Sequence, residues 1–290
     1  MMSSESKGMW LGLIGVAIFS LTLPFTRLAV AELNPLFVAL GRAVVAAAAS
    51  GLLLWWTAAP IPTAQQWKAL AITALGVVIG FPVLTSVAMR HVPASHGAIV
   101  IGTLPLATAL FGALRCGERP STGFWVAAVA GGAIAVAFGL LQGGGSLQVA
   151  DAALFAAVIA AAMGYAEGAR LSQALGGKNV ISWALLLSLP LLLPITIALG
   201  WHYGVAASLR AWVGFAYVSL FSMLIGFFFW YKGLALGGIA RVGQVQLLQP
   251  FLTLAGAALI AGEALEAGNF GFAAAIVAVV AIGRRMSIKR

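Results

Sequence analysis

The chain of 290 residues has few charged side chains, few acids among them and a single cysteine. Charged residues make up 8% of the chain and only seven residues are Asp or Glu, whereas soluble domains carry about 25% charged residues. This composition excludes an ordinary water-soluble globular domain. The single cysteine, Cys116, excludes a disulfide within the chain and a Cys-rich metal cluster.

Common catalytic motifs are also absent. The sequence contains no P-loop, no Gly-x-Ser-x-Gly nucleophile elbow and no His-Glu-x-x-His metal motif. We therefore expect a protein that is not an enzyme, holds no cofactor or metal, and does not use ATP directly. Nucleic acid is not an expected partner despite the net charge of +9, because the cations lie at helix ends and in the tail rather than along one face.

The sequence is rich in long apolar runs, and 62% of its residues are hydrophobic. A helix needs about 20 apolar residues to cross the hydrocarbon core of a bilayer. Ten segments meet this length, and they predict an all-α polytopic membrane protein with ten transmembrane helices. The predicted segments are 9–31, 34–56, 67–89, 93–115, 122–141, 151–175, 180–201, 211–235, 240–262 and 268–284.

An even number of spans places both termini on the same side of the membrane. That side carries most of the cations, and the opposite side has only Arg27, Arg90 and Arg210. Cytoplasmic loops of membrane proteins carry the excess of Lys and Arg. The sequence therefore predicts a multi-pass protein of the cell inner membrane with both termini in the cytoplasm. The cations on the predicted cytoplasmic side are Lys7, Lys68, Arg115, Arg119, Lys178, Lys232, Arg241, Arg284, Arg285, Lys289 and Arg290.

One pattern occurs twice, half the chain length apart. Pro105 is followed thirteen residues later by Glu118, and Pro250, which lies 145 residues after Pro105, is followed thirteen residues later by Glu263. A glycine precedes each of these glutamates. Because Pro and Glu are scarce in this chain, chance is a poor explanation, and the sequence predicts an internal repeat.

We interpret residues 1–145 as a first five-helix repeat and residues 146–290 as a second one. Five is odd, so the second repeat enters the membrane from the opposite side, which makes the architecture a 5+5 inverted-topology repeat. Inverted repeats are typical of transporters, whose two halves exchange conformations around a site near the bilayer midplane. The arrangement predicts alternating access.

With these features the chain resembles the drug/metabolite transporter superfamily, EamA type, which includes YddG-like exporters of amino acids and other metabolites. The resemblance implies a central cavity lined by spans one, three, four, six, eight and nine, with spans five and ten outside it. It also implies a small-molecule substrate, since members export metabolites and relatives carry nucleotide sugars or phosphorylated sugars. The residues that carry the resemblance are Pro105, Gly117, Glu118, Gly123, Gly131, Gly132, Pro250, Gly262, Glu263, Gly268 and Gly271.

Polar and aromatic side chains inside the spans are the candidates for substrate binding. Gln246 and Gln249 share one face of span nine beside Pro250, where their amides suit a polar zwitterion. Static contacts between helices are the alternative interpretation for each of these residues. The predicted substrate-binding residues are Thr22, Phe81, Thr85, Thr103, Tyr165, Ser222, Trp230, Gln246 and Gln249, and the predicted helix-bending residues are Pro24, Pro105 and Pro250.

Two ionisable residues within spans are candidates for proton coupling, namely His96 and Glu167. An intramembrane acid is costly and marks a functional site by default. The alternatives are a structural histidine at position 96 and an ion pair between Glu167 and Arg170, which lies three residues further along the same helix. The sequence leaves both pairs of interpretations open.

The substrate class follows from the scarcity of buried cations. Only Arg42 lies well inside a predicted span, whereas phosphorylated substrates usually call for several cations. We therefore expect a neutral or zwitterionic small metabolite, such as an amino acid, and a lipid bilayer as the other partner. The rival hypotheses are an exporter of drugs or sugar derivatives and a membrane scaffold that transports nothing. The sequence does not decide the oligomeric state, for which a monomer would suffice.

Overall fold

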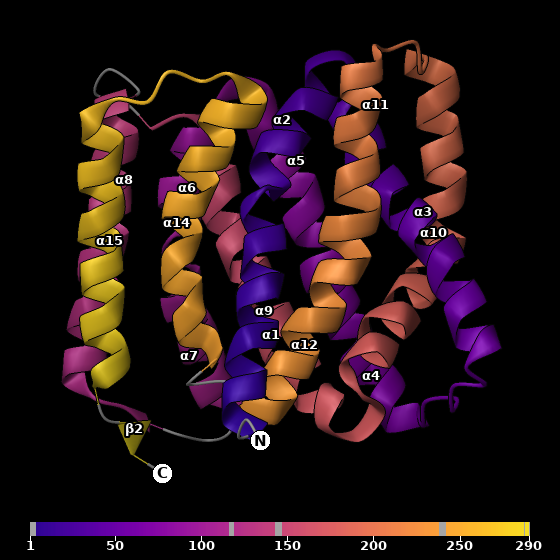
Figure 1. Ribbon diagram of the computed structural model, residues 1–290, viewed down its shortest axis with the longest axis horizontal. Coiled ribbons are helices and arrows are strands. Elements are labelled where there is room, and N and C mark those ends of the chain that lie inside the picture. The colour runs from indigo at the N-terminus through magenta and orange to yellow at the C-terminus, as the bar shows by residue number, and fades with distance from the viewer. Residues whose placement is uncertain (1–3, 116–118, 143–146, 238–241, 287, 290) are drawn as a thin grey trace.

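The computed structural model describes residues 4–115, 119–142, 147–237, 242–286 and 288–289. Within these ranges the protein is a bundle of helices that run up and down between two ends (Figure 1). We call the end where α1 begins and α15 ends the lower end, and the opposite end the upper end, as Figure 1 shows them. Gly117 and Glu118 of the first repeat motif lie outside the described residues.

The first half of the chain contributes these elements in order. They are α1 (Ser4–Ser20), α2 (Thr22–Glu32), α3 (Pro35–Trp56), α4 (Ala64–Thr73), the π-helical η1 (Ala74–Gly80), α5 (Phe81–His91), α6 (Ala94–Ile101), α7 (Leu104–Arg115), β1 (Arg119–Pro120) and α8 (Thr122–Gln142). Helix α3 begins where the Asn34 side chain accepts hydrogen bonds from the amides of Leu36 and Phe37, which satisfies donors that have no partner within the helix.

The second half contributes a similar series. It consists of α9 (Val149–Leu175), α10 (Gly177–Tyr203), α11 (Leu209–Ala216), the π-helical η2 (Tyr217–Ile225), α12 (Gly226–Gly237), the 3₁₀-helical η3 (Gly243–Leu248), α14 (Gln249–Gly256), the π-helical η4 (Ala257–Ala261), α15 (Ala267–Arg285) and β2 (Ile288–Lys289). The two-residue strands β1 and β2 pair antiparallel at the lower end.

Eight helical stretches within the described residues are long and apolar enough to cross a membrane. They are Ser6–Glu32, Pro35–Trp56, Ala64–His91, Ala94–Leu114, Thr122–Leu141, Val149–Leu175, Gly177–Tyr203 and Leu209–Gly237. Two shorter apolar helices, Val245–Ala261 and Ala267–Gly283, fall on the ninth and tenth predicted segments. The prediction of a helical, polytopic membrane protein is confirmed, and the count of ten crossings stays a prediction.

Helices from the two halves of the chain pack against one another throughout the bundle. Helix α1 lies along α12, α3 along α10, α8 along α15, and α9 along α5 and η1, while α6 contacts α14. Glycines permit the closest of these approaches. A Cβ atom at Gly76 would lie 2.5 Å from the Ala160 carbonyl oxygen, and one at Gly233 would lie 2.8 Å from the Gly12 nitrogen. Small residues therefore set the spacing of these helix pairs.

The three predicted bending prolines each lie just after a helix interruption. Pro105 is the second residue of α7 and Pro250 the second residue of α14, while Pro24 is the third residue of α2. An amide in the first turn of a helix has no intrahelical acceptor, so a proline there sacrifices no hydrogen bond. The chain thus places each proline where a span starts a new helical segment.

Candidate functional site

A central cavity lies among helices from both halves of the chain. The free space between its side chains is about 20 Å³, which is close to the least that holds one water molecule. Interrupted or π-helical backbone reaches the cavity in η1, at the start of α2 and in η2. Such irregular backbone is tolerated at membrane depth where it is enclosed by protein. The lining residues are Phe19, Thr22, Arg42, Val77, Phe81, Ala161, Tyr165, Ser222, Met223, Phe227 and Gln249.

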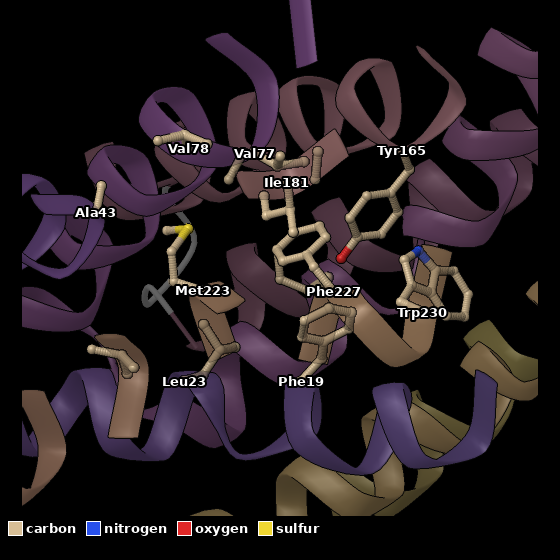
Figure 2. Packing of buried hydrophobic residues seen from close by; sticks show 14 of the residues in the cluster. Phe19, Leu23, Ala43, Val77, Val78, Tyr165, Ile181, Met223, Phe227 and Trp230 are labelled. Atoms are coloured by element: carbon tan, nitrogen blue, oxygen red, sulfur yellow. The ribbon is translucent and has the colours of Figure 1, made fainter. Parts of the chain in front are cut away.

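Aromatic rings form one wall of this cavity. The ring of Phe19 lies 5.0 Å from that of Phe227 and 6.3 Å from that of Tyr165, measured between centroids. Trp230 is fully buried behind them, 5.7 Å from the Tyr165 ring, and does not itself line the cavity. Figure 2 shows these four rings gathered together, with Met223 on the other side of Phe227. Such a wall offers apolar contact and aromatic faces for a cation.

The hydroxyl groups of Thr22 and Ser222 join the two halves of the chain across the cavity. Their oxygens lie 2.8 Å apart in a buried hydrogen bond. Thr85 and Thr103 behave differently, because they donate to carbonyl oxygens of their own segments, at Phe81 (2.6 Å) and Val100 (2.8 Å). Neither of these two threonines lines the central cavity. A ligand in this cavity would therefore meet the hydroxyls of Thr22 and Ser222 and the phenol of Tyr165.

The two predicted glutamines take different positions. Gln249 lines the cavity, whereas Gln246 is buried outside it, and its side-chain nitrogen has no hydrogen-bond partner among the described residues. The structure therefore brings together Thr22, Phe81, Tyr165, Ser222 and Gln249 of the predicted binding residues, and it places Thr85, Thr103, Trp230 and Gln246 outside the lining.

Arg42 is a cavity residue that was not among the predicted binding residues. It belongs to α3, in span two, and only 2% of its surface is exposed. Its Nε and Nη1 atoms have no hydrogen-bond partner within the described part of the chain. Span two thus supplies a lining residue, and span four supplies none among the described residues. The sequence contained an indication of this role, because Arg42 is the arginine that lies well inside a predicted span.

His96 forms a buried pair with Asp151. The His96 Nε2 atom lies 2.6 Å from Asp151 Oδ1, and the two residues are 6% and 1% exposed. Asp151 Oδ2 also accepts a hydrogen bond from the Gln148 amide at the start of α9. The pair joins α6 of the first half to α9 of the second half. Asp151 was not predicted as a site residue. The feature that could have indicated it is its position as an acidic residue at the start of the predicted span 151–175.

Two further acids lie close to His96 at the upper end. A pocket of about 110 Å³ beside the imidazole is lined by Glu266, and Glu263 accepts hydrogen bonds from the amides of Ala94 and Ser95, the two residues before His96. The ring of Phe138 covers another side of the imidazole, with centroids 5.0 Å apart. His96 therefore has both a buried acidic partner and an adjoining pocket.

Glu167 takes part in an ion pair near the lower end of α9. Its Oε1 atom lies 2.5 Å from Arg170 Nη2, and the Glu167 carboxylate is 1% exposed while the Arg170 side chain is 60% exposed. This is the arrangement that the alternative interpretation of the sequence describes.

A vestibule of about 540 Å³ opens at the upper end. It gathers Arg27, Arg90 and Arg210, which are the three arginines that the sequence assigns to that side, together with Glu32 and Glu263. No described residue lines both this vestibule and the central cavity. At the lower end a second pocket, of about 440 Å³, lies against α1, α10 and α12 and includes Lys178 and Lys232.

Charged side chains in the vestibule hold helix ends from different parts of the chain. Arg27 donates to the Met89 carbonyl (2.5 Å) and Arg210 to the Ile260 carbonyl (2.9 Å), near the ends of their helices. Glu32 accepts from the amide and hydroxyl of Ser208, both at 2.6 Å, just before α11 begins. Each contact places a charge where it opposes the helix dipole. These contacts between side chains and helix termini thus join helices from different parts of the chain around the vestibule.

The Gly-Glu motif of the second half has a visible structural role. Gly262 adopts the left-handed conformation, with φ of +71°, and ends η4. The Glu263 amide then bonds back to the Ala257 carbonyl (3.1 Å), which is the pattern of a glycine-terminated helix. The Glu263 carboxylate accepts hydrogen bonds from Ala94 (2.6 Å) and Ser95 (2.9 Å). The motif therefore ends span nine and caps the first turn of span four.

Comparisons with known proteins agree with this architecture. A curated protein of Bacillus subtilis (strain 168), described as "Uncharacterized transporter YdeK", is 48% identical over 286 residues, which cover 99% of this chain and 100% of that protein. A solved structure described as "Crystal structure of protein" has a similar fold, with a TM-score of 0.68, 19% identity and 96% of each chain covered. The EamA-like transporter family matches residues 6–140 and 148–283. The chain belongs to the EamA-like transporter family and is a multi-pass membrane transporter.

Proposed function

We propose that this transporter moves amino acids or closely related small metabolites outward across the cell inner membrane by alternating access. The observation that carries the proposal is the central cavity, which is buried, polar on one side and aromatic on the other, and built from both halves of the chain. Open pockets lie at the two ends of the bundle, on either side of this closed centre. A site that each end reaches in turn accounts for all three spaces.

An inverted repeat of residues 1–145 and 146–290 is part of the proposal. The two family matches, 6–140 and 148–283, fall on either side of its midpoint. A pseudo-two-fold that exchanges spans one to five with spans six to ten would exchange the α1–α12 contact with the α9–α5 contact, and both contacts occur. It would also map η1 onto η2, which are π-helical in the corresponding spans. The shorter helices Val245–Ala261 and Ala267–Gly283 would complete ten crossings.

The proposed orientation places the lower end in the cytoplasm. The described residues there include the exposed cations Lys7, Lys68 and Lys232, which the positive-inside rule assigns to the cytoplasmic face. The three upper arginines line the vestibule instead. Both termini would then be cytoplasmic, and export would run from the lower pocket to the upper vestibule.

Within the cavity we assign the polar contacts to Thr22, Ser222 and Gln249, and the aromatic contacts to Phe81 and Tyr165. The remaining predicted contacts, Thr85, Thr103, Trp230 and Gln246, would be reached only as the helices move. The helix interruptions before Pro24, Pro105 and Pro250 are the points at which spans one, four and nine would bend. Each interruption lacks a continuous hydrogen-bond ladder, so bending there breaks few bonds.

Proton coupling is assigned to His96 rather than to Glu167. The His96–Asp151 pair lies beside a pocket at the upper end, whereas Glu167 is paired with Arg170. The contact of His96 with Asp151 also joins the two halves of the chain. Protonation of this pair would therefore couple a charge change to the relative position of α6 and α9.

Counterflow in liposomes tests the proposed function. The purified full-length protein is reconstituted, loaded with each of the twenty amino acids in turn, and offered the same labelled amino acid outside at two pH values. We expect trans-stimulated uptake of at least one amino acid, with a rate that changes with pH. Uptake of drugs or sugar derivatives alone would favour the first rival hypothesis, and absence of flux for every compound would favour a scaffold.

A further inference from the structure

We propose that Arg42 binds the carboxylate group of the substrate, so that this transporter selects organic carboxylates, amino acids among them. The inference rests on the proposed function, because it takes the central cavity to be the transport site. It goes further in naming the chemical group that the site recognises and the residue that recognises it.

The first support is the burial of Arg42 without a partner. Arg42 lies within α3 (Pro35–Trp56), about two turns from its start; it is 2% exposed and leaves Nε and Nη1 without an acceptor among the described residues. An arginine at the centre of a membrane helix costs about 2.5–3.5 kcal/mol on insertion scales. A buried guanidinium is normally paired or hydrogen-bonded. Among the described residues, no side chain compensates this cost by accepting a hydrogen bond from Nε or Nη1 of Arg42. We therefore infer that the substrate supplies the acceptor for the guanidinium.

The second support is where the guanidinium lies. Arg42 lines the central cavity together with Gln249 and the hydroxyls of Thr22 and Ser222. Among the described lining residues no Asp or Glu is present to neutralise it. Guanidinium groups bind carboxylates through two parallel hydrogen bonds, which makes them specific for planar anions. The amide and hydroxyl groups beside Arg42 offer further donors to the same carboxylate.

The rest of the lining fixes the remaining chemistry of the substrate. Phe19, Phe81 and Phe227 offer apolar faces, which suit a hydrocarbon side chain and can accept an ammonium group by cation–π contact. The described lining contains no Asp or Glu that could form an ion pair with an ammonium group. The ammonium group of a substrate would therefore be held less strongly than its carboxylate. The carboxylate is thus the required group and the ammonium an optional one. Cationic drugs are disfavoured, because Arg42 would repel them.

A purely structural role for Arg42 makes a different prediction about stability. Replacing a structural arginine removes useful contacts and lowers the melting temperature. Replacing an unpaired buried charge with an apolar side chain of similar length is neutral or stabilising. Arg42→Met therefore separates the two roles: loss of binding with unchanged or higher melting temperature indicates a ligand-binding arginine. Arg285→Met is the matched control, since Arg285 is exposed at the end of α15.

The test measures thermal stabilisation of the purified full-length protein by three matched series. Each series contains an amino acid, its carboxamide and the acid that lacks the amino group. The series are L-leucine, L-leucinamide and 4-methylpentanoate; L-phenylalanine, L-phenylalaninamide and 3-phenylpropionate; and L-threonine, L-threoninamide and 3-hydroxybutyrate. In at least one series we expect the two carboxylates to bind at least tenfold more tightly than the carboxamide. Arg42→Met should abolish that preference, Arg42→Lys should weaken it, and Arg285→Met should retain it.

The outcomes distinguish this inference from the proposed function. Carboxylates that bind through Arg42 without any amino-acid counterflow would support the inference and remove amino acids from the proposed function. Amino-acid counterflow with equal affinity for acid and carboxamide, or with wild-type binding in Arg42→Met, would overturn the inference and leave transport intact. A failure of all six carboxylates to stabilise the wild-type protein would also overturn it.

Discussion

The contact of Glu263 with the start of α6 can be tested by removing its charge. The carboxylate accepts two hydrogen bonds, from the amides of Ala94 (2.6 Å) and Ser95 (2.9 Å). It thereby joins the end of span nine to the first turn of span four at the upper end. Glu263→Gln keeps the shape of the side chain but leaves a neutral acceptor in place of the carboxylate.

The magnitude follows from the strength of the two bonds. A hydrogen bond to a charged group contributes about 1.5–3 kcal/mol and a neutral one about 0.5–1.5 kcal/mol. The variant therefore loses about 1–1.5 kcal/mol per bond, or about 2–3 kcal/mol for the pair. Since 1.4 kcal/mol corresponds to a factor of ten, local opening of this turn should become about 30- to 150-fold more frequent.

Hydrogen–deuterium exchange of the peptide that covers residues 93–101 is the assay. We expect faster exchange at the start of α6 in Glu263→Gln and no change in Glu266→Gln, whose side chain is exposed three residues away. The same local effect should leave the exchange of α3 unaltered. Equal exchange of the wild type and Glu263→Gln would refute the reasoning that this carboxylate caps span four.

Three further predictions concern packing, coupling and the site. Gly233→Ala should lower the melting temperature, because the new Cβ would lie 2.8 Å from the Gly12 nitrogen. Gly132→Ala should leave the melting temperature unchanged, because its Cβ would meet nothing within 4 Å. Equal melting temperatures of the two variants would contradict the close packing of α1 on α12. Asp151→Asn should flatten the pH dependence of counterflow, because His96 loses its acidic partner, and an unchanged pH profile would remove the pair from coupling. Gln249→Ala should weaken substrate binding about 2- to 13-fold, which is the equivalent of one neutral hydrogen bond. The effect of Gln246→Ala should be smaller, since only Gln249 of the two lines the cavity. A larger effect of Gln246→Ala would place the substrate elsewhere in span nine.

Most of the fold was predictable because bilayer spans are long and uniform. Segment boundaries agreed with the helices to within a few residues in most cases, for example 34–56 against Pro35–Trp56. The interruptions within spans were only partly predictable. Pro24, Pro105 and Pro250 each lie in the first turn of a new helical segment, and bending at these points stays a prediction. The π-helical turns of η1 and η2 contain no residue type that signals them. A π-helical turn depends on tertiary packing more than on local sequence.

The candidate site was harder to predict because its members meet only in three dimensions. Thr22 and Ser222 are 200 residues apart in sequence and form one hydrogen bond. Arg42 was noticed as an intramembrane cation but was not placed in the site, since the family resemblance implied a cavity without span two. Asp151 stands at the first turn of its helix, where an acid is common for reasons of helix capping. The sequence alone gave no reason to pair it with His96.

The central claim is that one cavity between the two halves is reached from both ends in turn. The most direct measurement is the accessibility of a single cysteine at position 222, made by Ser222→Cys in a chain whose Cys116 is replaced by serine. A membrane-impermeant thiol reagent is applied from either side of reconstituted vesicles, with and without a transported substrate. The account predicts labelling from both sides and protection by substrate on both. Labelling from one side only, unaffected by substrate, would contradict it.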